Sequence, residues 1–381
     1  MATKSKVSLI KCENYNPAEV ESALHKALEP LGGISNFVKP GQTVLIKPNA
    51  LLGKSPESAV TTHPSLVAAV VKEVLRAGAT PLVGDSPGNA YANVTKTIEK
   101  TGIISAVEAA GGKMVYFQQE GIIKVKNPSG NKRMEQLHIA QPATSADVII
   151  NLPKLKTHNL TAYTGAIKNM FGVIPGFNKA NYHASSPLPR NFSSLLVDIY
   201  QSVMPKLNIM DAVIGMEGHG PSNGKPRKLG LIIASADGVA LDAVGSFLIG
   251  FKPEQILTTA IAYKRKLGEM RLENIDICGC DHYQVRQKDW KKAVNLYSFL
   301  AFPFLSQIKI LPFINQDKCT RCQVCVKSCP TKTINYDLKR KKVEINPKNC
   351  ISCFCCHELC EFDAVNLRRS WLVKLLGIGN S

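Results

Sequence analysis

The chain has 381 residues, of which 45% are hydrophobic, and a formal net charge of +18. This length and apolar content are enough for one large domain and one small domain. No run of about 18 uninterrupted apolar residues occurs, so we expect no membrane-spanning helix. Residues 1–14 have no apolar segment after their basic residues, so we expect no signal peptide and a reducing, cytoplasmic location.

Short apolar runs alternate with segments of helical periodicity up to about residue 285. In 63–77 the apolar residues recur at helical spacing and Gly78 follows, which predicts a helix that ends there. We expect strands at 7–10, 43–46, 80–83, 115–117, 122–125, 148–152, 207–210 and 229–234, and further helices at 95–110, 192–204, 236–249 and 254–267. This alternation predicts that residues 1–285 form an α/β domain, with a mixed, mostly parallel sheet flanked by helices.

Polar side chains follow several of the predicted strands, which is where ligands bind in α/β sheets. Lys47 ends one strand, Asp85 ends another, and the segment 154–158 follows a third. Lys168 lies in a short glycine-rich segment, and Lys179 and His183 come soon after. Together they predict a cationic pocket for a carboxylate or phosphate, in which the candidate catalytic residues are Lys47, Lys154, Lys156, His158 and Lys168. Taken singly, any of these lysines is better explained as a solvated surface charge.

Two further segments have simple structural interpretations. The glycine-rich loop 215–224 lacks the G-x-G-x-x-G pattern and leads into a strand, so we exclude a dinucleotide site. We interpret it as a hairpin turn, with an anion-binding nest of backbone N–H groups as the alternative. Asp237 precedes a predicted helix, so we expect it to be the N-cap.

Residues 286–316 are rich in aromatic and basic side chains, and Pro303 and Pro312 would interrupt any long helix. We interpret this connector as a linker packed on both domains. The alternative is contact with a membrane surface, and the basic, apolar tail 369–381 has the same two interpretations. From residue 282 onward, 17 Lys and Arg face seven Asp and Glu, which favours an acidic redox partner protein, an anionic membrane or an anionic substrate. No nucleic-acid recognition motif is present, so we expect no nucleic-acid partner.

Eight of the twelve cysteines form two runs of the pattern C-x-x-C-x-x-C-x-x-x-C. This is the spacing of ferredoxins with two 4Fe–4S clusters, in which the fourth cysteine of each run binds the other cluster. It predicts a small α+β, ferredoxin-like domain over 317–368 with two clusters as cofactors. We assign Cys319, Cys322, Cys325 and Cys360 to the first cluster, and Cys350, Cys353, Cys356 and Cys329 to the second.

Zinc is the competing interpretation of these cysteines, but a doubled run of four fits two zinc ions poorly. Cys355 lies between two predicted ligands, and we expect it not to bind iron.

Several segments of residues 7–280 resemble the domain-of-unknown-function 362 family, whose members often carry a C-terminal ferredoxin module. The resemblance rests on four motifs: Ile46-Lys47-Pro48-Asn49, Pro153-Lys154-Leu155-Lys156-Thr157-His158, Gly165-x-x-Lys168-Asn169-x-x-Gly172 and Met216-Glu217-Gly218-x-Gly220-Pro221. Asp237 and Asp242 fit the same pattern. The resemblance implies the fold class and the iron–sulfur assignment. It implies no reaction, so the roles of the pocket residues rest on their chemistry alone.

Three functions agree with these features. The first is an iron–sulfur oxidoreductase that passes single electrons between a redox partner and a small anionic substrate in the α/β domain. The second is a ferredoxin-like electron carrier whose α/β domain docks a partner enzyme without doing chemistry. The third is a non-redox isomerase or binding protein with structural clusters, which the doubled cluster disfavours. An enzyme should show Lys and His groups in one pocket near a cluster, whereas a carrier should show no enclosed pocket.

Overall fold

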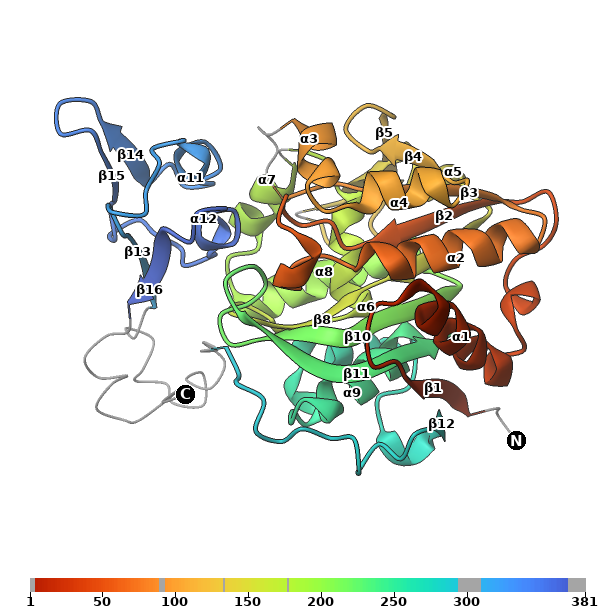
Figure 1. Cartoon of the computed structure of the whole chain (residues 1–381). Helices are drawn as coiled ribbons and strands as arrows, with labels where there is room; N and C mark the ends of the chain where they lie inside the picture. The colour runs from red at the N-terminus through yellow and green to blue at the C-terminus, as the bar shows by residue number, and fades with distance from the viewer. Residues whose placement is uncertain (1–3, 89–92, 133, 177, 294–309, 369–381) are drawn as a thin grey trace.

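A mixed sheet of ten strands forms the centre of the computed structural model, which describes residues 4–88, 93–132, 134–176, 178–293 and 310–368 (Figure 1). Within these residues its strand order is β12-β1-β11-β10-β7-β2-β3-β4, and β8 pairs with β10 and β9 beside that path. Pairing is parallel except at β1–β11, β10–β11 and β8–β9. The strands are β1 (Ser5–Lys11), β2 (Thr43–Pro48), β3 (Thr80–Asp85), β4 (Lys113–Tyr116), β7 (Val148–Leu152), β8 (Lys154–His158), β9 (Ala162–Thr164), β10 (Leu207–Glu217), β11 (Lys225–Ser235) and β12 (Ile275–Gly279). The expected mixed, mostly parallel sheet is confirmed.

Helices cover both faces of this sheet because successive strand residues point to opposite sides. On β2, Val44 and Ile46 belong to one core, which they share with α1 (Pro17–Leu28), α2 (Pro64–Arg76) and α4 (Ile103–Ala109). Leu45, between them, belongs to the core on the opposite face. That face is covered by α6 (Ala166–Asn169), α8 (Pro189–Ser202), α9 (Gly238–Leu248) and α10 (Leu257–Lys264). The shorter helices are α3 (Val94–Glu99), α5 (Gln141–Ser145) and α7 (Asn178–Ser185), and β5 (Ile122–Lys126) pairs with β6 (Gln136–Ala140) as a separate hairpin.

Local sequence explains where the helices begin and end. Pro64 begins α2 after His63, whose side chain accepts from the Ser65 N–H, and the left-handed Gly78 follows soon after its end. The helix expected over 95–110 is instead two helices, α3 and α4. Gly102 separates them with a φ of 73°, which a continuous α-helix does not allow.

The module that carries the cysteine runs lies beside the α/β domain, at the blue end of the colour scale (Figure 1). Each cysteine run is followed by a strand after its short helix. Antiparallel pairs form between β13 (Leu311–Ile314) and β16 (Val365–Arg368) and between β14 (Ile334–Asp337) and β15 (Lys342–Ile345), and the helices are α11 (Val324–Lys327) and α12 (Cys355–Glu358). The expected small ferredoxin-type domain is therefore present.

The beginning of the predicted connector packs against the α/β domain. Trp290 is buried, and the Arg227 guanidinium lies over its ring at 5.1 Å from the ring centroid. The aromatic residues 297–304 of the connector and the whole tail 369–381 lie outside the described residues, so both interpretations of these segments stay predictions. In the described part of the chain, every helix is too short or too polar to cross a bilayer.

Asp237 is the N-cap of α9, as the sequence predicts, and it also joins distant segments. One oxygen accepts from the N–H groups of Val239 and Ala240, and the other accepts from the Ser5 hydroxyl at 2.6 Å and the Glu269 N–H at 2.8 Å. We therefore expect Asp237→Ala to lower the free energy of unfolding by about 2–3 kcal/mol. Urea unfolding of anaerobically prepared protein, followed by circular dichroism, measures this loss.

The matched control is Asn16→Ala, which removes the exposed N-cap of α1 with its single bond to the Ala18 N–H and should cost about 0.5–1 kcal/mol. Equal losses in the two variants would show that Asp237 acts as a cap only.

Candidate functional site

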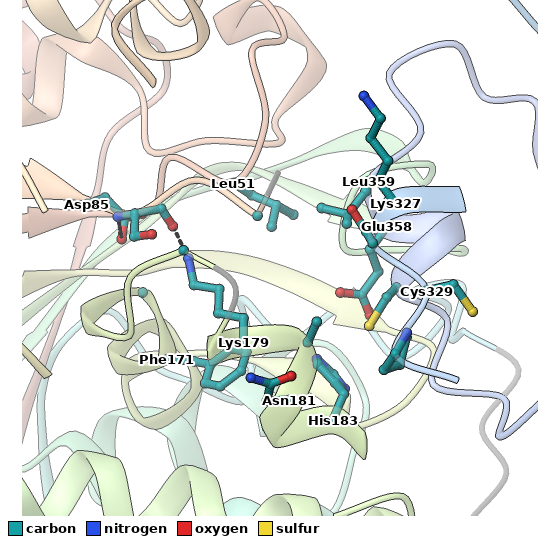
Figure 2. Close-up of a pocket in the computed structure, with 18 of the residues that line it drawn as sticks. Leu51, Asp85, Phe171, Lys179, Asn181, His183, Lys327, Cys329, Glu358 and Leu359 are labelled. Atoms are coloured by element: carbon teal, nitrogen blue, oxygen red, sulfur yellow. Dashed lines mark hydrogen bonds between the residues drawn. The ribbon is translucent and has the colours of Figure 1, made fainter. Parts of the chain in front are cut away.

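A cavity of about 260 Å³ lies between the α/β domain and the module. Residues that follow β2 and β3 bound it on the α/β side, together with residues of α6 and α7. Residues of α11 and α12 and the chain that follows them bound it on the module side (Figure 2). Its charged and sulfur-bearing side chains are Asp85, Lys168, Lys179, His183, Lys327, Cys329, Lys332, Cys355 and Glu358. The cavity thus lies at the ends of parallel strands, where α/β sheets bind ligands.

Lys168 is the predicted site residue that is most available to a ligand. It lines the large cavity and a neighbouring space of about 30 Å³. Within the described residues, its ammonium group makes no hydrogen bond and no ion pair. Burial lowers the pKa of Lys168, and the negative charges of Glu358 and Cys355 oppose this effect. A partly buried ammonium without a close partner is a natural site for an anion.

Helix α6 holds Lys168 in place through a carboxylate on α9. Asp242 accepts from the Ala166 N–H at 2.6 Å and the Ile167 N–H at 3.1 Å. Burial raises the pKa of Asp242 to about 7 against the lowering effect of these two bonds. Gly165 permits this approach, since a Cβ there would lie 1.9 Å from Asp242 Oδ1.

Lys47 forms a buried ion pair in the wall of the cavity. Its Nζ lies 2.7 Å from Asp85 Oδ1, and Asp85 Oδ2 accepts from the Ala50 N–H. Burial lowers the pKa of Lys47, and Asp85 offsets part of that effect. Gly172 lets the backbone pass over this pair, because a Cβ there would lie 2.0 Å from Asp85 Oδ1. The glycine spacing around Lys168 therefore has a steric cause at both ends.

Lys154 and Lys156 lie behind the wall and do not line the large cavity. Lys154 Nζ pairs with Asp211 at 2.8 Å and donates to the Tyr15 hydroxyl at 2.8 Å. Lys156 Nζ donates to Asn49 Oδ1 at 3.0 Å and to the Val60 carbonyl at 2.8 Å. These contacts support the walls. The catalytic roles predicted for Lys47, Lys154 and Lys156 stay predictions.

His158 faces the module instead of the centre of the cavity. Its Nδ1 accepts from the Leu160 N–H, and its Nε2 lies 3.3 Å from Glu358 Oε1 on α12, without hydrogen-bond alignment. Burial lowers the pKa of His158, and the charges of Lys168 and Lys156 lower it further. Burial raises the pKa of Glu358 to about 7, opposed by the same two lysines. Nothing in the cysteine spacing indicates that Glu358 points into the other domain, so the sequence analysis missed it.

The two remaining candidates of the sequence analysis also line the cavity. Lys179 donates to the carbonyls of Ser86 and Pro87, and burial lowers its pKa to about 7. His183 stacks on Phe192 with ring centroids 4.2 Å apart and contacts the edge of Phe171. Burial lowers the pKa of His183 to about 3, so it acts as a neutral aromatic wall at ordinary pH.

A chain of asparagine amides crosses the sheet beneath the cavity. The Asn208 amide donates to the Ser235 carbonyl, Asn151 donates to Asn208, Asn169 donates to Asn151, and Asn49 donates to Asn169. Lys156 completes the chain by donating to Asn49. Asn49 and Asn169 line the cavity, so this chain fixes the orientation of two of its amide groups. No periodicity marks these asparagines, which lie in β7, β10, α6 and the loop that follows β2.

The eight predicted ligands surround two separate spaces in the module. Cys319, Cys322, Cys325 and Cys360 line one, and Cys329, Cys350, Cys353 and Cys356 line the other together with Cys355. The two spaces therefore separate the two groups of four that the ferredoxin pattern predicts, and the second space also has Cys355 in its wall. Within the described residues, no three His, Cys, Asp or Glu side chains converge as the ligands of one metal ion would. Four thiols around a space suit an iron–sulfur cluster better than a single zinc ion.

The negative charges of neighbouring thiols act on Cys325. Burial, followed by the charges of Cys322, Cys360 and Cys319, raises the pKa of Cys325 to about 12. An iron core would offset this repulsion, because coordinated thiols are deprotonated. The fourth cysteine of each run also accepts from the N–H four residues later, Thr333 for Cys329 and Ala364 for Cys360, both at 3.3 Å. Hydrogen bonds to cluster sulfurs tune reduction potentials.

The glycine-rich loop after β10 anchors the module. It forms the β10–β11 hairpin turn, which agrees with the simpler interpretation of the sequence. The Ser222 hydroxyl donates to the Glu358 carbonyl at 2.9 Å, and the Asn223 amide donates to the His357 carbonyl at 3.0 Å. Lys54 pairs with Asp363 at 2.8 Å nearby. These contacts hold α12 against the cavity.

Iron analysis tests the grouping of the cysteines. Because a cubane needs four thiolates, we expect about eight irons in the wild-type protein and about four in both Cys329→Ala and Cys350→Ala. Electron paramagnetic resonance should show that these two variants lose the same signal. Cys355→Ala is the matched control and should keep all of the iron. A different lost signal in Cys329→Ala and Cys350→Ala would contradict the grouping.

The lowered pKa of Lys179 predicts a pH dependence of stability. Between its folded pKa of about 7 and its ordinary value of 10.5, the unfolded state binds more protons than the folded state. The free energy of unfolding of the wild type should therefore rise relative to that of Lys179→Met as the pH increases from 7 to 10. Urea unfolding at several pH values measures this difference. The control Lys206→Met, at an exposed position, should show the same change of the free energy of unfolding with pH as the wild type. If Lys179→Met also showed that change, the prediction would be wrong.

Two protein-family models match two different parts of the chain. The model described as domain of unknown function (DUF362) matches residues 44–246, and the model described as 4Fe-4S dicluster domain matches residues 311–361. The module is therefore an iron–sulfur domain of the ferredoxin type. Among solved structures, the lactate racemase apoprotein of Thermoanaerobacterium thermosaccharolyticum covers 65% of this chain and 57% of its own, with 14% identity and a TM-score of 0.41. A similarity this low says nothing about activity.

Relatives match either most of the chain or the module alone. A thylakoid-associated protein of Synechocystis sp. is 39% identical over 255 residues, which are 67% of this chain and 77% of the relative. Subunit IorA of the indolepyruvate oxidoreductase of Pyrococcus abyssi is 37% identical over 51 residues, which are 13% of this chain and 8% of that subunit. The DUF362 model covers the strands from β2 to β11 and the residues of the α/β domain that line the cavity. The chain belongs to the DUF362 family and carries a 4Fe-4S dicluster domain at its C-terminal side.

Proposed function

We propose that this protein is an iron–sulfur oxidoreductase that binds a small anionic substrate in the cavity between its two domains. When bound by the eight cysteines, two 4Fe–4S clusters would supply and accept single electrons. The observation that carries the proposal is that Cys329, a predicted ligand, lines the same cavity as Lys168, whose ammonium has no hydrogen-bond or ion-pair partner among the described residues. Chemistry in the cavity would therefore take place next to a cluster.

Charge around the cavity supports an anionic substrate. Lys168, Lys179, Lys327 and Lys332 line it, against two carboxylates, Asp85 and Glu358. Asp85 already has its partner in Lys47, and Glu358 is opposed by the charges of Lys168 and Lys156. An incoming anion would restore the balance of charge in a partly buried space, where electrostatic attraction is stronger than in water.

Size and shape support a small molecule. The cavity of about 260 Å³ is below the range of roughly 300–1,000 Å³ of pockets for drug-sized ligands. The amides of Asn49 and Asn169 and the ammonium of Lys168 provide donors, and Phe171 and His183 provide an apolar wall. A cavity that brings Lys and His side chains together beside a predicted cluster ligand favours the oxidoreductase over an electron carrier.

We retain the cytoplasm as the proposed location, because thiols must stay reduced to hold clusters. The name of the Synechocystis relative makes a membrane surface the alternative.

Replacing Lys168 by methionine tests the proposal. Dithionite-reduced protein is mixed anaerobically with small carboxylates or inorganic phosphate, and cluster reoxidation and the electron paramagnetic resonance spectrum are followed. We expect at least one anion to speed up reoxidation or change the spectrum of the wild type. Loss of a charge-assisted contact should weaken its apparent affinity in Lys168→Met by roughly ten- to a hundredfold.

Lys124→Met, on the exposed hairpin β5–β6, is the matched control and should behave as the wild type. Dithionite should reduce all three proteins equally. The proposal is overturned if anions affect Lys168→Met as they affect the wild type, or if no anion has an effect on any of them.

A further inference from the structure

We propose that the surface of the module around Cys322 is the docking site for a small acidic electron-transfer protein. The site, named here the basic face, consists of Lys318, Arg321, Cys322, Phe362 and the turn 338–342 between β14 and β15. It lies outside the cavity, so the proposal does not depend on which substrate the cavity binds.

Exposure of Cys322 places a predicted ligand at this surface. Of the eight cysteines assigned to clusters, Cys322 alone is exposed. It lines the first cluster space with Cys319, Cys325 and Cys360, and none of these four lines the substrate cavity. The second cluster space reaches the cavity through Cys329. Because electron tunnelling falls steeply with distance, a partner would exchange electrons best at Cys322, and a substrate at Cys329.

Positive charge surrounds Cys322 from two segments of the module. Lys318 and Arg321 are exposed beside the first cysteines of the run. The Arg321 Nε donates to the Lys341 carbonyl at 2.8 Å, which joins this loop to the turn after β14. That turn carries four consecutive exposed cations, Lys339, Arg340, Lys341 and Lys342. Asp317, Asp337 and Glu344 are the acids of the same segments, so six cations face three acids.

The remaining acids of the module are held at the contact with the α/β domain. Glu358 is buried at the cavity, Glu361 lies 3.6 Å from Lys100, and Asp363 pairs with Lys54. Three of the six acids of the module therefore lie at the contact with the α/β domain, whereas six of its cations are exposed on the basic face. This uneven distribution is what a partner of negative charge would match.

An apolar centre accompanies the basic rim. Phe362 lines the first cluster space and is 47% exposed, and Leu338, next to the basic turn, is 78% exposed. Stable interfaces combine aromatic or aliphatic side chains with a polar rim that steers association. The basic face has both features next to a predicted cluster ligand.

Charge reversal of the turn tests this proposal on the complete protein with its clusters. The variant Lys339→Glu/Lys341→Glu/Lys342→Glu is compared with Lys113→Glu/Lys124→Glu/Lys126→Glu, which changes the net charge equally at exposed positions of the α/β domain. The probe is an acidic two-cluster ferredoxin. Its binding is measured by biolayer interferometry, and the rate constant of cluster reduction by its dithionite-reduced form is measured by stopped flow at several salt concentrations.

We expect the turn variant to bind the ferredoxin more weakly and to be reduced on the order of tenfold more slowly at low salt, with a flatter salt dependence. The control variant should stay within about twofold of the wild type at each salt concentration, a small effect beside the roughly tenfold or greater gain that local steering provides. Reduced methyl viologen, a small cation, should reduce the turn variant at least as fast as the wild type, which shows that its clusters are intact.

Equal slowing in both variants, or a wild-type rate without salt dependence, would overturn the proposal. If the turn variant lost binding to phosphatidylserine vesicles while its reduction by the ferredoxin stayed unchanged, the basic face would belong to a membrane surface instead. No cavity substrate enters these measurements. A failure here is therefore distinct from a failure of the proposed oxidoreductase.

Discussion

Burial of Glu358 between the two domains is the constraint on which the rest of the site depends. A carboxylate removed from water is costly unless cations and donors surround it. Here His158 faces it at 3.3 Å, and the charges of Lys168 and Lys156 act on it. If the module moved away, Lys168 and Lys156 would lose a negative charge that offsets part of the cost of their burial. The carboxylate and the two lysines thus stabilise one another, which favours contact between the module and the ends of the strands.

Much of the fold could be predicted because its signals are local. The doubled cysteine pattern predicted the ferredoxin-type module, and apolar periodicity predicted α2 almost to its ends. Such signals do not reveal a helix boundary that depends on the backbone conformation of one residue, as at Gly102 between α3 and α4. They also fail for β8 and β9, because the lysines of β8 are buried by partners that are distant in sequence. A polar strand of that kind does not show the alternation of a half-buried strand.

In the candidate site, too, local signals could be predicted and contacts between distant residues could not. Lysines at strand ends predicted a cationic pocket, and Lys168 and Lys179 do line the cavity. The sequence could not show which of the other lysines form buried ion pairs and therefore do not face the cavity. Lys47 and Lys154 each meet an aspartate from a neighbouring strand, Asp85 and Asp211. Pairing of this kind depends on strand order, and strand order is a property of the whole sheet.

The amide chain from Lys156 to Ser235 has a direction. Each asparagine accepts through its oxygen from one neighbour and donates through its nitrogen to the next, so no member can be turned over without turning all of them. Lys156 can only donate and the Ser235 carbonyl can only accept, so the two ends impose one polarity on the row. These four side-chain amides therefore form one oriented row of dipoles. A change at Asn208 on β10, two strands away from β2, would alter the hydrogen bonding of Asn49 at the cavity and so the binding of a molecule there.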